Sequence, residues 1–170
     1  FDAATSTLTY VVTSPETNQC TIIDPVLDYD ESSASVSTAS ADNVVRYVRE
    51  NSLSVDYILE THVHADHLSG AHYLRRHLGG LVGIGAEITG VQSTIAEIYS
   101  DSSSLARNGS QFDVLLEDEH RLAFGSLDIR VLHVPGHTPG CVAYLIGDAL
   151  FAGDTLFMPD SGTARCDFPG

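Results

Sequence analysis

The stretch Thr61-His62-Val63-His64-Ala65-Asp66-His67 places four ionisable side chains within six residues. All four are of types that bind borderline metals such as zinc or ferrous iron. Two histidines two residues apart can point the same way, while Asp66 and His67, at the start of the following helix, can face a second metal or orient the ligands of the first. The density of ligand types predicts a metal site, with a chance cluster of solvated histidines as the alternative.

A short buried strand is predicted directly before this loop. Val55, Tyr57 and Leu59 form an apolar run with Ile58 between them, and a run of this length bounded by polar residues is typical of a buried strand. The histidine loop therefore begins at the carboxyl end of a strand, which is where open α/β sheets usually hold their ligands.

Two further candidate ligands also follow predicted strands. His137 lies in Val134-Pro135-Gly136-His137-Thr138-Pro139-Gly140, where Pro and Gly predict a tight turn that lets a ligand approach a metal closely. Asp154 ends Phe151-Ala152-Gly153-Asp154. Alone, each residue is more typical of an ordinary turn, whereas together with the histidine loop they indicate a ligand set of His62, His137 and Asp154.

The rest of the chain alternates predicted strands and helices, which favours an α/β fold with two mixed sheets covered by helices. Alternating apolar residues predict a hairpin that Asp24-Pro25 ends, and residues 30–40 are expected to form an exposed loop. Apolar residues at helical spacing predict three helices, the first capped by Ser40 or Asp42 and the second ended by Gly79-Gly80. The hairpin is predicted at 8–12 and 20–23, the helices at 41–51, 68–78 and 88–99, and the remaining strands at 81–84, 113–116, 120–124, 127–133, 141–146 and 149–152.

Length and composition limit the classes of protein. A chain of 170 residues with 43% hydrophobic content predicts a single soluble domain, and no apolar run is long enough to cross a bilayer. The formal net charge of −15 argues against nucleic acid as a partner. Cys20, Cys141 and Cys166 are too widely spaced for a disulfide framework. They predict a reducing compartment, the cytoplasm or, in a eukaryote, the mitochondrial matrix.

Taken together, the histidine loop, Gly136-His137-Thr138 and Gly153-Asp154 resemble the metallo-β-lactamase superfamily over about residues 7–170. The resemblance implies a four-layer αββα sandwich. Thr61 to His67, Gly153-Asp154-Thr155-Leu156-Phe157 and the stretch from Gly162 to Phe168 look most like the persulfide dioxygenase branch, and glyoxalase II is the nearest relative with different chemistry.

The resemblance to persulfide dioxygenases implies one Fe(II) held by His62, His137 and Asp154, a two-histidine, one-carboxylate set. A low-molecular-weight thiol persulfide, such as glutathione persulfide, and O2 would be the substrates, and a homodimer is possible. The other loop residues would orient the iron ligands, and two of them would take part in catalysis. The implied catalytic residues are His64 and Asp66, the orienting residues are His64, Asp66 and His67, and the implied substrate-binding residues are Arg165 and Cys166.

Two alternatives stay open. In a glyoxalase II-like thioester hydrolase, one or two Zn(II) ions would replace iron, and His64, Asp66 and His67 would bind metal directly. In an inactive relative, the chain would be a metal-binding module without turnover. The superfamily usually supplies a further histidine well downstream of the Gly-Asp pair, and the chain ends at Gly170 without it. We therefore expect the domain, residues 1–170, to be truncated at its C-terminus.

Overall fold

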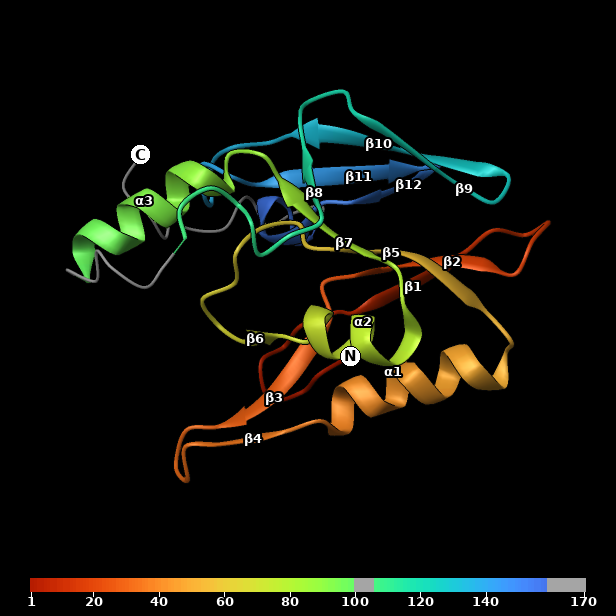
Figure 1. Cartoon of the computed structure of the whole chain (residues 1–170), viewed down its shortest axis with the longest axis horizontal. Helices are drawn as coiled ribbons and strands as arrows, with labels where there is room; N and C mark the ends of the chain where they lie inside the picture. Colours follow the sequence, from red (N-terminus) through yellow and green to blue (C-terminus); the bar gives the residue numbers. More distant parts are fainter. Residues whose placement is uncertain (100–105, 159–170) are drawn as a thin grey trace. The chain divides into compact units, whose positions relative to one another are not determined.

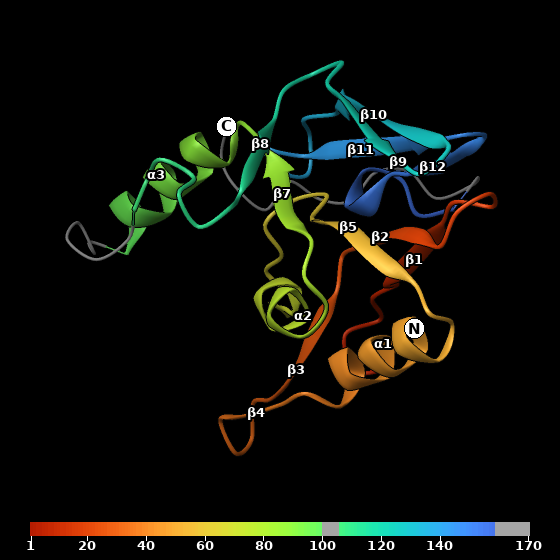
Figure 2. The same ribbon diagram turned by 45° about the vertical axis from the view of Figure 1, so that its right-hand side comes forward.

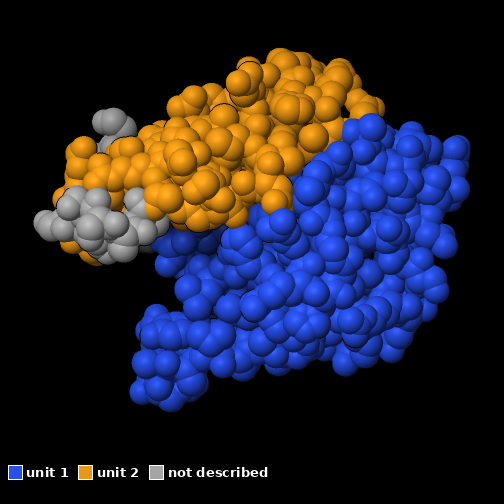
Figure 3. All heavy atoms as spheres, viewed as in Figure 1, with its two compact units in different colours: residues 1–60, 64–82, 123–127 blue, residues 61–63, 83–122, 128–170 orange. Residues whose placement is uncertain are grey.

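The computed structural model describes residues 1–99 and 106–158. The chain divides into two compact units, coloured separately in Figure 3. Within the described ranges, no helix combines the length and the apolar character needed to cross a membrane. Unit 1 comprises residues 1–60, 64–82 and 123–127, and unit 2 comprises residues 61–63, 83–122 and 128–170.

Unit 1 contains the predicted hairpin and the strand that leads into the histidine loop. Strand β1 (Tyr10–Thr13) pairs antiparallel with β2 (Gln19–Ile23), with Tyr10 opposite Ile23. Strand β5 (Ser54–Leu59) lies parallel on the other side of β2 (Figure 1). The hairpin and the buried strand are therefore confirmed, with small shifts in their bounds.

The two helices of unit 1 are amphipathic and bury their apolar faces. Helix α1 (Ala39–Glu50) buries Val45 and Val48, and α2 (Ala71–Leu78) buries Leu74. The two helices lie side by side, as Figure 2 shows. Gly79 follows α2 with a φ of +78°, and its N–H donates to the carbonyl of Arg75. The predicted glycine end of this helix is thus confirmed.

The predicted cap of α1 is wrong. Thr38 is the cap residue, and both Ser40 and Asp42 lie inside the helix. The Ser40 hydroxyl donates to Asp28 at 2.5 Å, and Asp42 accepts a hydrogen bond from the Thr38 hydroxyl at 2.8 Å. The backbone N–H of Ser40 also donates to Asp28 at 2.9 Å, so a carboxylate from β3 takes the place of the predicted cap.

A small three-stranded sheet in unit 1 was not predicted. Strand β3 (Val26–Asp30) pairs antiparallel with β4 (Ser35–Ser37) and with β6 (Leu68–Ser69). The expected loop at 30–40 therefore contains a strand, although β4 is exposed as expected. Leu68 lies in β6, outside the helix predicted for it, because its backbone pairs with β3.

Residues 83–85 of strand β7 (Leu81–Gly85) lie in unit 2 and pair there in parallel with β8 (Val114–Leu116). Helix α3 (Ile88–Ile98) packs against this pair through a small core of Ile84, Ile88 and Val91. The bounds of α3 agree with the predicted helix to within one residue, because its apolar spacing is regular.

A separate four-stranded sheet has the strand order β12-β11-β10-β9. Its best-defined pairing joins β10 to β11 in antiparallel register, with Val131 opposite Tyr144. Both of these residues are fully buried, and the pairing continues to His133 and Val142, on either side of the turn that holds His137. The strands are β9 (Arg121–Phe124), β10 (Leu127–His133), β11 (Val142–Ile146) and β12 (Ala149–Phe151).

Candidate metal centre

Three separate turns of unit 2 carry the predicted ligands. His62 follows β5, His137 lies in the turn between β10 and β11, and Asp154 lies in a 3-10 turn, Gly153–Thr155, after β12. The backbone N–H of Val142 donates to the carbonyl of Thr61 at 2.9 Å, which ties the beginning of the histidine loop to β11. Sheet pairing thus brings the ligands together from positions far apart in the sequence.

The three side chains form a close cluster. Their nearest ligand atoms all lie within 4.8 Å of one another. The rings of His62 and His137 meet edge to face, with centroids 4.7 Å apart, and His137 Nε2 lies 3.6 Å from Asp154 Oδ2. The histidines are only 1% and 4% exposed, whereas the Asp154 side chain keeps 35% exposure. The cluster is therefore accessible to solvent from the side of the carboxylate.

The donor set suits a metal ion. Atoms that share a metal at about 2.1 Å lie roughly 3.0–3.4 Å apart, and the separation between His137 and Asp154 is close to that range. Thr61 Oγ1 bonds to His62 Nδ1 at 3.0 Å, which leaves the buried Nε2 as the ring atom available to a metal. Two imidazoles and one carboxylate suit zinc or ferrous iron, so the residues fit the implied group.

The turn around His137 is tight, as its Pro and Gly residues predict. Gly136 N–H donates to the carbonyl of Thr138 at 3.2 Å. The N–H of Thr138 bonds to the sulfur of Cys141, also at 3.2 Å, and Gly140 N–H donates to the Thr138 hydroxyl. Cys141 is buried here, as is Cys20 in β2, so both behave as the core residues that the sequence predicts.

Position 153 requires a glycine for two reasons, its backbone conformation and the close approach of Thr61. Its φ is +49°, and an added Cβ would lie 2.8 Å from the Cβ of Thr61 and closer still to its hydroxyl. We expect Gly153→Ala to lose about 1–3 kcal/mol of stability, and also metal affinity, because it displaces Asp154 and the Thr61–His62 pair. Gly147→Ala is the control, since Gly147 has a φ of +60° and open space around it. Thermal unfolding and metal titration would measure both effects; equal affinity in the two variants would contradict the prediction.

A second group of possible ligands lies in unit 1. The nearest ligand atoms of His64, Asp66 and His67 lie within 4.8 Å of one another, and the rings of His64 and His67 have centroids 4.1 Å apart. Asp66 and His67 precede β6 instead of opening a helix, which corrects their predicted position. Burial raises the pKa of the Asp66 carboxyl, but the charges of His67 and His64 and the hydrogen bonds that the carboxylate accepts together outweigh burial and lower the pKa. Asp66 is thus a carboxylate at neutral pH.

His64 is held by two buried carboxyl groups. Its Nε2 lies 3.2 Å from Asp24 Oδ1 and 3.2 Å from Glu60 Oε2. Burial lowers the pKa of His64, but the hydrogen bonds to the two acids outweigh this and raise it well above its usual value. Burial in turn raises the pKa of Glu60, whose other oxygen accepts from the Ser69 hydroxyl. Any bond from His64 to a metal would therefore use Nδ1.

Sequence reasoning missed the residues that hold these histidines. Asp24 was interpreted only as a strand end, although it emerges from β2 in the same way that Asp154 emerges from β12. Glu60 directly follows β5, so the same signal could have identified it. The hydroxyls of Thr61 and Thr7 gave no signal, because threonine is common on strands and in turns. The predicted substrate residues Arg165 and Cys166 lie outside the described residues.

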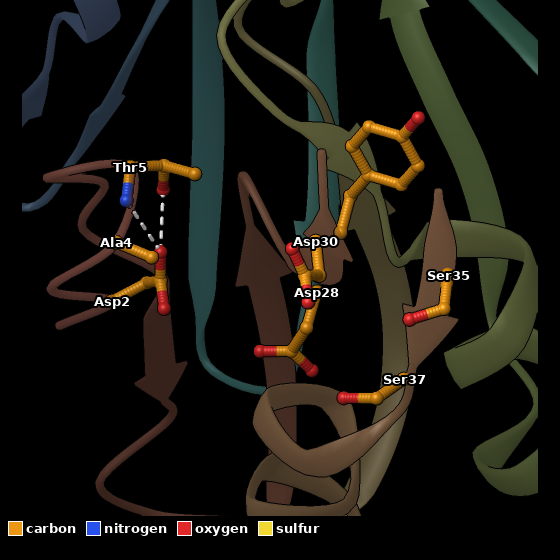
Figure 4. Close-up of a pocket in the computed structure, with 8 residues that line it drawn as sticks. Asp2, Ala4, Thr5, Asp28, Asp30, Ser35 and Ser37 are labelled. Carbon is orange, nitrogen blue, oxygen red and sulfur yellow. Dashed lines mark hydrogen bonds between the residues drawn. The ribbon is translucent and has the colours of Figure 1, made fainter. Parts of the chain in front are cut away.

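A cavity of about 150 Å³ in unit 1 is lined partly by acidic residues (Figure 4). Neighbouring groups already satisfy its carboxylates. Asp28 accepts from the N–H and hydroxyl of Ser40, Asp30 from the Ser33 hydroxyl, and Asp2 from Thr5. It contains none of the predicted ligands. The lining residues are Asp2, Ala4, Thr5, Asp28, Tyr29, Asp30, Ser35 and Ser37.

The metallo-beta-lactamase superfamily profile matches residues 3–169. The chain belongs to this superfamily and has its α/β fold of mixed sheets and helices, as its motifs predict. Its candidate His/Asp sites are consistent with a metal ion.

Individual relatives agree with this assignment. The chain is 51% identical over 170 residues to a beta-lactamase hydrolase-like protein of Agrobacterium fabrum, covering 100% of this chain and 39% of the relative. It is 47% identical over 180 residues to a protein of Burkholderia pseudomallei named as a probable metallo-hydrolase, covering 100% and 61%. It thus spans only part of the length of these curated relatives.

Among solved structures, the chain is similar to ETHE1 from Myxococcus xanthus, with a TM-score of 0.72 and 30% identity. The match covers 99% of this chain and 60% of that one.

Proposed function

We propose that the protein is an iron-dependent persulfide dioxygenase, which oxidises a low-molecular-weight thiol persulfide with O2. The observation that carries the proposal is the cluster of His62, His137 and Asp154 within unit 2, which is a two-histidine, one-carboxylate set. Such a set would hold ferrous iron through three protein ligands and leave other coordination positions for substrate and oxygen, as in non-haem iron oxygenases. The motif resemblance to the persulfide dioxygenase branch supports the same choice.

The proposed reaction converts persulfide, O2 and water into thiol, sulfite and protons. The terminal sulfur is oxidised by four electrons, O2 is reduced by the same number, and the sulfur–sulfur bond breaks so that the thiol leaves. Bound ferrous iron would supply a shared binding point for sulfur and oxygen, which removes much of the entropic barrier to their meeting.

The residues of the chain would hold and orient that iron. His62 and His137 are almost fully buried, so their rings exclude water from one side of the cluster. The bond of Thr61 to His62 Nδ1 fixes which ring atom faces the metal. Asp154, a third exposed, faces the side from which dissolved substrates can arrive. Catalytic roles for His64 and Asp66 stay predictions.

Oxygen uptake tests the proposal directly. Full-length protein loaded anaerobically with Fe(II) should consume O2 when glutathione persulfide is added and should release sulfite in equal amount. His62→Ala should reduce uptake to the background rate, because it removes one of three protein ligands. His72→Ala is the control, since His72 is exposed on α2 and outside the ligand groups. Uptake no higher in the wild type than in His62→Ala would contradict the proposal.

A second candidate function is a thioester hydrolase of the glyoxalase II type. The group of His64, Asp66 and His67 in unit 1 favours it, because these residues could hold a further metal, and the names of the relatives point to hydrolysis. Paired metals lower the pKa of a bound water towards 7 and generate hydroxide at neutral pH. Turnover of S-lactoylglutathione by protein with two metals per chain, without oxygen uptake, would support this candidate. Metal binding without any turnover would instead indicate an inactive module.

A further inference from the structure

The first residues of the chain form a closed loop that ends on a hydroxyl group. Asp2 N–H donates to the carbonyl of Thr7 at 2.9 Å. The Asp2 carboxylate accepts from the N–H of Thr5 at 2.8 Å and from its hydroxyl at 2.6 Å, the two bonds drawn in Figure 4. Ser6 completes the turn in the left-handed region, with a φ of +61°. The loop therefore fixes the backbone that carries Thr7.

The Thr7 hydroxyl contacts both acidic and basic members of the histidine loop in unit 1. Its oxygen lies 3.3 Å from His67 Nδ1, 3.4 Å from Asp66 Oδ2 and 2.9 Å from the Thr5 hydroxyl. Asp66 Oδ2 is itself 3.3 Å from His67 Nδ1. The contacts to the histidine loop are at the long end of the hydrogen-bond range, so none of them fixes the ring alone.

These contacts determine which ring nitrogen of His67 carries the proton. A carboxylate can only accept, so the contact of Nδ1 with Asp66 Oδ2 requires the proton on Nδ1. The neutral ring then keeps a lone pair on Nε2. That atom is buried and has no hydrogen-bond partner among the described residues. A proton placed on Nε2 would leave a buried donor unsatisfied, which costs about 1–3 kcal/mol.

Asp66 is poorly suited to hold this arrangement by itself. Its side chain is 51% exposed, so water competes for the carboxylate and weakens its bond to the ring. Thr7 is half-buried and anchored by the closed loop. Its oxygen can accept from His67 Nδ1 while its proton goes to Asp66, which ties these two side chains to a fixed point of the backbone.

We propose that Thr7 is a positioning residue of the histidine loop: it holds His67 as the Nδ1–H tautomer and keeps the buried Nε2 lone pair free to act. The use of that lone pair in catalysis rests on the proposed function, whereas its presence does not. Hydrogen bonds link Asp2 to Thr5 and Thr5 to Thr7, so the N-terminal loop helps to position His67.

Nitrogen NMR of the two imidazole nitrogens of His67 tests this inference without substrate, oxygen or metal. In metal-free protein labelled with ¹⁵N on histidine, at a pH where the ring is neutral, we expect Nδ1 of His67 to show the shift of a protonated nitrogen and Nε2 that of an unprotonated one. Thr7→Val keeps the shape of the side chain and removes the hydroxyl. In this variant the shifts of Nδ1 and Nε2 should move towards each other, or each nitrogen should take the shift that the other has in the wild type. Thr7→Ser should restore the wild-type pattern.

Two further variants keep the test decisive. Thr13→Val removes an exposed hydroxyl from the end of β1, away from the N-terminal loop, and should leave the His67 shifts unchanged. Thr5→Val removes the anchor of Thr7 but not its hydroxyl, and should give a partial shift even if Thr7→Val fails to fold. Wild-type His67 shifts in a folded Thr7→Val or Thr5→Val would overturn the proposal. Because neither readout involves activity, failure of the dioxygenase assay would leave this result unaffected.

Discussion

Removing either His137 or Asp154 should abolish metal binding at the cluster in unit 2. Each residue supplies one of three protein ligands. Substitution of a residue that only orients a ligand typically lowers metal affinity about 10–100-fold, and loss of a ligand itself should lower it further. His137→Ala also leaves a cavity among residues that are almost fully buried. We therefore expect metal content, measured by elemental analysis after dialysis of full-length protein, to fall to background if the protein binds a single metal. Activity should fall with it.

Matched controls separate ligand loss from general damage. Asp148→Ala removes an exposed carboxylate from the turn between β11 and β12, six positions before Asp154, and should keep full metal content. His133→Ala removes an exposed ring at the end of β10, which bonds to the carbonyl of Pro139. It should retain metal as well. Full metal content in His137→Ala or Asp154→Ala, with wild-type folding, would show that the cluster is not the metal site.

The helices and the central strands could be predicted because a regular apolar spacing determines them. Ile84, Ile88 and Val91 form one buried cluster, and α3 keeps the predicted bounds almost unchanged. The small strands β4 and β6 could not be predicted, because they are exposed and are defined only by pairing with β3. A segment of two or three residues is too short to show a periodic signal.

The positions of the candidate ligands could be predicted from their types and from the strand ends that carry them. The hydrogen-bond partners of these ligands could not be predicted, because no regular spacing in the sequence identifies a partner that is distant along the chain. The two carboxyl groups that contact His64 belong to the residues directly after β2 and β5, and the hydroxyl that contacts His67 belongs to a residue sixty positions earlier. These partners determine the tautomer and the charge of each histidine, and so what each one can do.

The number of metals per chain distinguishes the two candidate functions, and substitution of Asp66 should change that number in only one of them. In the dioxygenase, Asp66 only supports its neighbours. In the hydrolase, it would be a direct ligand of a second metal together with other members of its group in unit 1. Asparagine has nearly the same shape as aspartate and keeps an oxygen that can accept from His67 Nδ1, while Thr7 continues to contact the ring. Asp66→Asn therefore removes the charge with little change in the local structure.

We expect Asp66→Asn to keep a single equivalent of iron and to lose about 10–100-fold in affinity or activity. The measurement is metal content per chain of full-length protein purified without oxygen, with Asp148→Asn as an exposed control. A fall from two equivalents to one would overturn the mononuclear assignment, because only a direct ligand removes a whole metal when its charge is lost. One equivalent in both wild type and variant would leave the two-histidine, one-carboxylate site as the centre that the proposed oxidation requires.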